Sequence, residues 1–190
     1  MPDEYPVLFF ADPDEWEQWL AQEHATAQGV WLKFAKKSTG IPSLNHAGAL
    51  EVALCYGWID GQARGLDETY HLQKFTPRRA RSTWSKINRE KVTVLQEAGR
   101  MHPAGLAEVE RAKADGRWDA AYDPPSTATV PPDLQEALDK NPAAAEFFAT
   151  LTGSKRYAFL YRIQDAKRPE TRARRIATFV DLLNRGETLN

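Results

Sequence analysis

A basic segment at residues 74–91, KFTPRRARSTWSKINREK, holds the side chains with the clearest chemical potential. It contains seven Lys or Arg residues and a single acid, Glu90. Arginines at a helix entrance suit anions because free backbone N–H groups and the helix dipole favour negative charge there, and an aromatic ring can stack on a ligand. The segment therefore predicts an anion-binding site, whose candidate residues are Phe75, Arg78, Arg79, Arg81, Trp84, Ser85, Asn88 and Arg89.

A structural interpretation of the same segment competes with this one. Phe75 and Trp84 can enter the core while Ser82 or Ser85 caps the following helix. The arginines are then solvated or paired with acids elsewhere in the chain, as runs of charge usually are. Both interpretations stay open at the level of the sequence.

A second basic segment, residues 155–175, contains eight Lys or Arg residues and two acids. The rest of the chain carries ten basic and 23 acidic side chains outside the two segments, so a nearly neutral molecule separates its charges. Such separation can steer an anionic partner toward a basic surface. We expect the two segments to converge on one surface for an anionic ligand or an acidic protein surface, to which the second contributes Lys167, Arg168, Arg172 and Arg175.

Arginines of the second segment also suit the phosphates of nucleic acid. Against this, Arg172 and Arg175 share an amphipathic helix with Ile176, where arginine stems often cover the rim of a core. The chain shows neither an RNA-binding aromatic motif nor a helix-turn-helix pattern, and its isoelectric point of about 6.4 is low for such a protein. Nucleic acid is therefore a partner that the sequence allows but does not favour.

A third constellation lies around the sequence WIDG. A helix end that faces a hairpin could form a small-molecule pocket around Trp58, Asp60, Arg64 and His71. Asp60 or Glu68 would act there as a base and His71 as an acid. Otherwise Asp60 caps the turn or pairs with an arginine of the first basic segment. An enzyme or a small-molecule-binding protein is thus the alternative function.

No residue pattern indicates a metal site, a cofactor or a covalent nucleophile. The single Cys55 excludes an internal disulfide framework and a cysteine zinc site, and its apolar surroundings indicate an inert core thiol. Phosphate-loop glycines and a Ser-His-Asp order are missing from the sequence. We therefore expect no metal and no cofactor, and the sequence favours a protein that is not an enzyme.

The elements that position these residues begin with a helix that is capped by Asp12, has Pro13 at its first position and runs to Gly29. Alternating apolar residues predict a strand in GVWLKFAKK, and helical spacing predicts a helix from Ser43 to Gly61. QARGL and YHLQKFT then predict a hairpin. With EYPVLFF as a first strand, the predicted order is β-α-β-α-β-β.

Two further helices are predicted before residue 120. One begins near Ser82 or Ser85 and ends at Gly99, and the other runs from Pro103 to Asp115. The first of them is predicted to bury a face made of Ile87, Val94, Leu95 and Ala98.

A proline-rich linker at residues 121–132 separates an α+β domain at 1–120 from a helical region at 133–190, because four prolines among small polar residues cannot continue a helix. Apolar periodicity beyond the linker predicts helices at about 133–140, 143–152, 155–166 and 170–185. The predicted fold class is α+β: a small, mainly antiparallel sheet with packed helices, followed by a C-terminal all-helical bundle.

The N-terminus, MPDEYPVLFF, carries acids where a secretory signal needs positive charge. No window approaches the roughly 20 uncharged apolar residues of a membrane helix. We therefore expect a cytoplasmic protein without membrane insertion. No heptad pattern long enough for a coiled coil defines an oligomeric state.

Several motifs occur in an order and spacing that resemble a known family. They extend over roughly residues 16–186 and read ALCYGWIDG, a hairpin with LDE, KFTPRRARSTWSKINRE, EAGRMHPAG and AKRPETRARRI. The chain thereby resembles the YdeI/OmpD-associated family, also called bacteriocin-protection proteins. The resemblance implies a role in resistance to cationic antimicrobial peptides or bacteriocins, linked to an outer-membrane porin, and supplies no catalytic residues. We expect a bacterial, non-enzymatic, stress- or defence-related binding protein with a basic surface.

Overall fold

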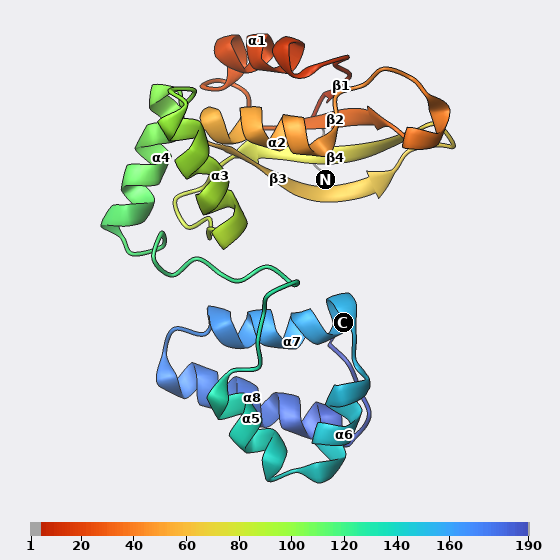
Figure 1. The fold of residues 1–190 in the computed structure, drawn as a ribbon, viewed down its shortest axis with the longest axis vertical. Helices are drawn as coiled ribbons and strands as arrows, with labels where there is room; N and C mark the ends of the chain where they lie inside the picture. Colours follow the sequence, from red (N-terminus) through yellow and green to blue (C-terminus); the bar gives the residue numbers. More distant parts are fainter. Residues whose placement is uncertain (1–4, 190) are drawn as a thin grey trace. The chain divides into compact units, whose positions relative to one another are not determined.

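The computed structural model describes residues 5–189, and it divides the chain into two compact units. The first unit contains residues up to 84 together with 88–121, and the second contains residues 85–87 together with 122 onward. A four-stranded sheet with helices makes up the first unit, and helices alone make up most of the second (Figure 1). The predicted α+β fold class is confirmed.

The sheet of the first unit consists of β1 (Val7–Leu8), β2 (Val30–Ala35), β3 (Trp58–Gly65) and β4 (Tyr70–Pro77). Its spatial order is β1-β2-β4-β3. β1 pairs with β2 in parallel, and the other two pairings are antiparallel, so the sheet is mainly antiparallel as predicted.

Two helices, α1 (Pro13–Glu23) and α2 (His46–Cys55), cover one face of this sheet. The carboxylate of Asp12 accepts from the Glu15 backbone N–H at 3.0 Å, which is the predicted cap of α1. Trp16 of α1 is fully buried, lies 5.9 Å from Phe75 of β4 between ring centroids, and donates its indole N–H to the Ala49 carbonyl of α2. The core therefore lies between these helices and the inward-facing side chains of β2 and β4.

The prediction of a helix from Ser43 to Gly61 was wrong at both ends. α2 is capped by Asn45, whose side chain accepts from the Gly48 N–H, because the Ser43 hydroxyl instead accepts from a backbone N–H of β2. The helix ends at Cys55, since Gly57 adopts a φ of +75°, a left-handed conformation that stops a helix. WIDG therefore begins β3 instead of ending the helix.

The helix α1 also ends earlier than predicted, at Glu23, with a turn before Gly29. A short 3-10 helix, η1 (Lys37–Thr39), follows β2. α4 (Pro103–Ala114) agrees with its prediction and buries Val109 and Ala112.

The face predicted for α3 (Lys86–Glu97) was wrong in three of its four residues, because Ala98 is exposed just after the helix and two others are exposed within it. Ile87 and Val94 are 42% and 63% exposed, whereas Val92 and Leu95 are buried. Asn88 lies on the buried face at the matching helical spacing. The polar Asn88 hid this face from a pattern based on apolar residues.

The second unit contains α5 (Pro132–Asp139), α6 (Pro142–Thr150), α7 (Gly153–Asp165) and α8 (Pro169–Asn184), each within two residues of its predicted bounds. Their core includes Leu134, Phe148, Phe159, Ile163 and Leu183. Residues 123–131, which precede α5, form neither helix nor strand.

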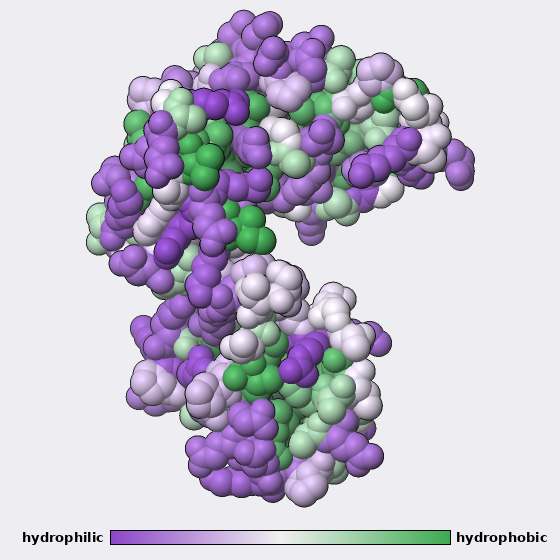
Figure 2. Space-filling view, viewed as in Figure 1, coloured by the Kyte–Doolittle hydropathy of each residue, from purple (hydrophilic) through white to green (hydrophobic). Residues whose placement is uncertain are grey.

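The surface visible in Figure 2 is mainly hydrophilic, with hydrophobic patches in each unit. Within residues 5–189, no helix is both long enough and apolar enough to cross a membrane.

Candidate functional site

Arg78, the first arginine of the predicted anion site, is 6% exposed. Its guanidinium carbon lies 3.5 Å from the ring centroid of Trp84, and its Nη1 donates to the Thr83 carbonyl at 3.2 Å. Its backbone N–H donates to the Gly57 carbonyl. These contacts hold the loop between β4 and α3 against the core.

The remaining candidates of the first basic segment divide into buried and exposed side chains. Phe75 and Trp84 are core residues, and Ser85 and Asn88 are 9% exposed. Arg89 donates to the Trp118 carbonyl at 2.8 Å. Among the candidate residues of this segment, Arg79 and Arg81 are the exposed ones.

Arginines of the second basic segment also make internal contacts. Arg172 binds Asp133 through two hydrogen bonds of 2.5 and 2.8 Å and donates to the Ile163 carbonyl. This pairing lowers the pKa of Asp133 and raises that of Arg172. Arg175 donates to the Arg162 carbonyl and lies 3.4 Å from Asp165.

Lys167 and Arg168, the other candidates of the second segment, are exposed. Arg78 and Arg79 belong to the first unit, whereas Arg172 and Arg175 belong to the second. The convergence of the two basic segments stays a prediction.

The predicted pocket residues have separate partners. Trp58 is 1% exposed and donates its indole N–H to the His24 carbonyl at 3.2 Å. Asp60 pairs with His46 at 2.9 Å on the helix-covered face. The rings of His71 and Phe34 lie 5.5 Å apart.

Arg64, the fourth predicted pocket residue, stands on the other face of the sheet. Arg64 is paired with Leu72 of β4, so the two side chains share a face of the sheet. Leu72 is three residues from Phe75, which faces the core, and residues an odd number apart on a strand point to opposite faces. A bulge between Asp60 and Ala63 changes the alternation of β3. The sequence analysis grouped Asp60 with Arg64 because it placed WIDG at a helix end facing the hairpin, whereas both residues lie in β3.

The open face of the sheet, opposite α1 and α2, brings cations and aromatic rings together. Alternation in β2 and β4 places Trp31 and Lys33 on this face beside Tyr70 and Lys74, because directly paired residues share a face. Tyr5 and Phe9 reach it from around β1, since Val7 pairs with Trp31. We call this set the basic–aromatic face: Tyr5, Phe9, Trp31, Lys33, Arg64, Tyr70, Leu72 and Lys74.

Each cation of the basic–aromatic face lies over at least one ring. The Lys33 ammonium is 4.3 Å from the Tyr70 centroid and 5.4 Å from that of Phe9. The Arg64 guanidinium is 4.2 Å from Trp31, and the Lys74 ammonium is 4.7 Å from Tyr5. These distances are within the range of cation–π attraction.

Trp31 lies beneath the cations at the centre of the basic–aromatic face. It is 5% exposed, and its indole N–H has no hydrogen-bond partner among the described residues. Asp67 in the β3–β4 turn is engaged elsewhere, since its carboxylate accepts from the Thr69 and Tyr70 N–H groups at 2.7 Å. The sequence analysis missed this face because it needs the register of β2 against β4, although alternation in GVWLKFAKK already paired Trp31 with Lys33.

A histidine cluster, also missed, joins α1, the end of α2 and the start of α4. The rings of His24 and His102 lie 4.7 Å apart, and that of Tyr56 stacks on His102 at 4.8 Å. His102 Nδ1 accepts from the Ala104 N–H and caps α4. Burial, and to a lesser degree His24, lower the pKa of His102.

Cys55 is fully buried, and burial raises the pKa of its thiol to about 11. A protonated, inaccessible thiol is a poor nucleophile. Within residues 5–189, no group of three or more His, Cys, Asp or Glu side chains is placed to hold a metal ion.

A polar cluster in the second unit surrounds Asp123. Its carboxylate accepts from the Lys86 ammonium at 2.5 Å and from the Gln164 amide at 2.9 Å, which lowers the pKa of Asp123. The Tyr157 hydroxyl donates to the Asp123 carbonyl, and burial raises the pKa of Tyr157 to about 12. These bonds fix the backbone before α5.

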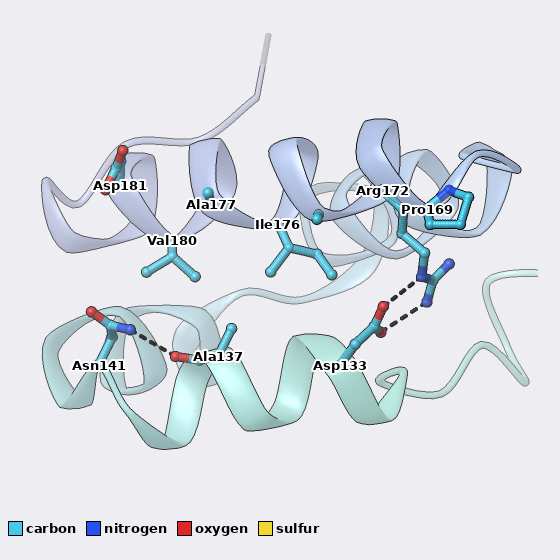
Figure 3. A pocket seen from close by; sticks show the side chains of 10 residues that line it. Asp133, Ala137, Asn141, Pro169, Arg172, Ile176, Ala177, Val180 and Asp181 are labelled. Atoms are coloured by element: carbon cyan, nitrogen blue, oxygen red, sulfur yellow. Dashed lines mark hydrogen bonds and ion pairs between the residues drawn. The ribbon is translucent and has the colours of Figure 1, made fainter.

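A slot of about 560 Å³ lies between α5 and α8 of the second unit (Figure 3). Ion-paired Asp133 and Arg172 stand at one end, and Asn141 and Asp181 stand at the other. The side chains between the two ends are apolar: Ala137, Ala173, Ile176, Ala177 and Val180.

Two family models match the chain, one in each of its two parts. Residues 8–108 match the model of a domain of unknown function, DUF8412. Residues 127–186 match the model described as "Bacteriocin-protection, YdeI or OmpD-Associated", which confirms the resemblance seen in the sequence. The motifs of the first basic segment fall within the part that matches DUF8412. No curated protein and no solved structure matches the chain.

Proposed function

The chain belongs to the DUF8412 family and carries a YdeI/OmpD-associated region at residues 127–186, and on this premise we propose that it is a non-enzymatic binding protein for an anionic partner. We place the binding surface on the basic–aromatic face of the first unit. The observation that carries the proposal is the stacking of Lys33, Arg64 and Lys74 on aromatic rings of an open sheet face.

Stacking prepares these cations for a ligand. A guanidinium that lies flat on a ring keeps its N–H groups directed outward at its edge, where carboxylate or phosphate oxygens can accept from them. Lys33 and Arg64 form no ion pair with any residue in 5–189, so the surface retains positive charge. An anion would gain charge-assisted hydrogen bonds there without first separating a carboxylate from these two side chains.

Flatness of the surface favours an extended anionic partner over a small enclosed one. A strand face presents side chains in rows about 4.8 Å apart, and the three cations come from three different strands. A single acidic side chain reaches one of them, whereas an acidic peptide or a polyanion reaches all three.

An enzymatic role around Trp58, Asp60, Arg64 and His71 has less support. Trp58 is a core residue, Asp60 pairs with His46, and Arg64 stands on the opposite face. We therefore assign binding and not catalysis to this unit. The family description of residues 127–186 supports a stress- or defence-related role, which we propose to be exercised in the cytoplasm.

The nature of the anion separates two forms of this proposal. Surfaces that bind single-stranded nucleic acid also combine cations with aromatic rings, on which the bases stack. Phe9 is 40% exposed and could accept a base in this way. We favour an acidic protein segment, because Trp31 is covered and Tyr70 is already stacked by Lys33, which leaves few open ring faces for bases.

The test is binding of a fluorescent 12-residue poly-glutamate peptide to the full chain, measured by anisotropy over a series of salt concentrations. We expect Lys33→Gln with Arg64→Gln to weaken binding about 10-fold, because two charge-assisted contacts are lost. Arg79→Gln with Arg81→Gln removes the same charge in the same unit and serves as the control, with an effect below about 2-fold.

If the two double variants weaken peptide binding equally, the loss of affinity follows from the change in net charge alone, and the proposed surface is wrong. A 12-residue oligothymidylate is measured in parallel. If it binds at least 10-fold more tightly than the peptide, with a slope of log K against log salt near −2 for three contacts, the partner is nucleic acid and not an acidic protein segment.

A further inference from the structure

The strand β3 lies at an edge of the sheet (Figure 1). Within residues 5–189, β4 is the one strand that pairs with it. Such an edge carries backbone N–H and C=O groups without ladder partners and can accept a further strand. Beyond the bulge of β3, residues 63–65 are exposed and include neither proline nor lysine, which commonly protect an edge. We call residues 63–65 the free edge of β3.

The hydrogen bonds of the β3–β4 hairpin determine which backbone groups of the free edge point outward. The Leu66 N–H donates to the Tyr70 carbonyl at 3.3 Å, so the backbone of Leu66 faces β4. Backbone groups alternate in direction along an antiparallel strand, so Arg64 also faces β4, while Ala63 and Gly65 face away. In the part of the chain that the structure describes, no backbone–backbone hydrogen bond outside the β3–β4 pairing involves Ala63 or Gly65. The N–H and C=O groups of both residues are therefore open to a new strand.

The side chains at the free edge favour an acidic partner. In a docked strand, the residue opposite Arg64 would point to the same side of the sheet as Arg64, which is the basic–aromatic face. A carboxylate there would accept charge-assisted hydrogen bonds from a guanidinium that is stacked on Trp31 at 4.2 Å. On the other side of the sheet, Ala63 is small and the Cβ position of Gly65 has no neighbour within 4 Å, so the alternate residues of the docked strand can be larger.

A second copy of the chain fits the same edge poorly. Two copies of β3 related by a two-fold axis could use both outward-facing residues only by placing their Arg64 side chains directly opposite each other. Like charges in that position destabilise a strand pair. An axis at Ala63 would instead bring the bulge that follows Asp60 into the pairing, where the ladder is disrupted. The free edge therefore favours a partner of opposite charge.

From this geometry we propose that an extended acidic protein segment adds to the four-stranded sheet as a further strand along residues 63–65. The backbone of the segment bonds with Ala63 and Gly65, and every second residue of the segment lies on the basic–aromatic face, where an acid meets Arg64. This inference rests on the proposed binding of an acidic segment to that face. It adds that main-chain hydrogen bonds hold the segment while the alternate side chains supply specificity.

The test uses a fluorescent nine-residue peptide in which threonine and glutamate alternate, together with two N-methylated forms that have the same charge. When the glutamates lie beside Arg64, the N–H groups of the threonines face β3 and those of the glutamates face away. Binding to the full chain is measured by anisotropy. Methylation of every threonine should weaken binding at least about 10-fold, because the bonds to β3 are lost, and methylation of every glutamate should weaken it by less than about 2-fold.

Hydrogen exchange of the ¹⁵N-labelled full chain examines the same bonds from the protein side. At saturating peptide, the amides of Ala63 and Gly65 should exchange at least about 10-fold more slowly than in the free chain. In the free chain, the Arg64 amide should exchange more slowly than both of its neighbours, because it already faces β4. This difference checks the assigned directions of the backbone groups.

Two substitutions at one exposed position form a matched pair. Ala63→Pro removes an outward-facing N–H and no hydrogen bond of the β3–β4 pairing, so it should weaken the unmethylated peptide about 10-fold. Ala63→Val keeps that N–H and should change the Kd by less than about 2-fold. The dispersion of the amide spectrum shows whether each variant is folded.

The outcomes separate this inference from the proposed function. Suppose that the peptide binds and Lys33→Gln with Arg64→Gln weakens it, yet the two methylated forms bind equally and the amides of Ala63 and Gly65 stay unprotected. The segment then lies on the basic–aromatic face without joining the sheet, so strand addition is wrong and the proposed function stands. If no acidic peptide binds, both are wrong. A chain that sediments as a dimer and becomes monomeric in Ala63→Pro would mean that the free edge pairs with a second copy, which also overturns the inference.

Discussion

The basic–aromatic face and the α5–α8 slot differ in how far their side chains fill the surface and in where their charges lie. On the open sheet face, long cationic side chains lie over the rings and cover Trp31, so the surface is charged but filled. In the slot, alanines leave a hollow that no neighbouring side chain fills, and the charge is confined to its ends. The basic–aromatic face thus presents positive charge without a cavity, whereas the slot is a cavity with charged side chains only at its ends.

The secondary structure beneath each region explains the difference. Strand side chains stand perpendicular to the sheet in regular rows, so Lys and Arg stems can lie across neighbouring rings. Helices meet along ridges and grooves, so a run of small residues opens a channel parallel to their axes. Both units contain a tight core, and the comparison can be tested by adding or removing atoms at matched places.

The largest effect is expected at Gly105 in α4, where the first unit has no spare room. A Cβ atom there would lie 2.1 Å from the Cys55 carbonyl oxygen, which is backbone and cannot move aside. Gly105→Ala should therefore destabilise the protein by at least about 3 kcal/mol, although alanine in an unobstructed helix would stabilise it by about 1 kcal/mol. Urea denaturation followed by circular dichroism measures the change.

Ala177→Leu in the slot is the counterpart, since it adds three carbon atoms and should cost less than about 1 kcal/mol. A loss at Ala177 as large as that at Gly105 would show that the slot closes in solution, and the contrast between the units would fail.

A smaller effect is expected from two neighbouring arginines that the sequence could not tell apart. Arg78→Ala should lower the free energy of unfolding by about 2–3 kcal/mol, because it removes a buried guanidinium stacked on Trp84 and a hydrogen bond to Thr83. The exposed Arg79→Ala is the matched control, with a change within about 0.5 kcal/mol. Chemical denaturation of the two variants compares them, and equal stabilities would mean that Arg78 is not a structural residue.

The smallest effect concerns pH, which should affect the two units in different ranges. The folded pKa of His102 is lowered from 6.5, so the unfolded chain takes up a proton first and stability falls as the pH drops below about 6.5. Protonation also breaks the cap, since Nδ1 then cannot accept from the Ala104 N–H. The folded pKa of Asp133 is lowered from 3.8 by Arg172, so its contribution is present above about pH 4 and is lost as the pH falls further.

Hydrogen exchange resolved by residue measures both units in one sample. The first unit should lose protection between pH 7 and 5 by less than about 1 kcal/mol, and the second only below pH 4. His102→Gln should flatten the pH dependence of protection in the first unit, and Asp133→Asn should flatten that in the second. Profiles that coincide in wild type would refute the assignment of these groups.

Most elements of this fold were predictable because their signals are local. The cap at Asp12 and the apolar spacing of α5 to α8 depend on residues within two turns of one another. The end of α2 was not predictable in this way, because ALCYGWIDG has helical apolar spacing throughout. Only the conformation of Gly57 directs Trp58 into a strand. The buried face of α3 was missed for a related reason, since Asn88 is polar yet packs inward.

The candidate sites depended far less on local signals. The first basic segment was recognised from composition, yet composition does not distinguish Arg78, which is buried, from Arg79, which is exposed. The basic–aromatic face requires the register of three strands, and the slot requires two helices that are thirty residues apart in the chain.

By itself, the sequence determined the fold class, the family resemblance, the positions of most helices and the separation of basic from acidic segments. Caps, periodicity and charge counts are properties of neighbouring residues, so they can be read before the chain folds. Only the tertiary structure decided which cations are buried against carbonyls and rings, and which stand over an open sheet face. The physical reason is that burial and pairing depend on residues far apart in the chain, as Arg172 with Asp133 and Arg64 with Trp31 demonstrate.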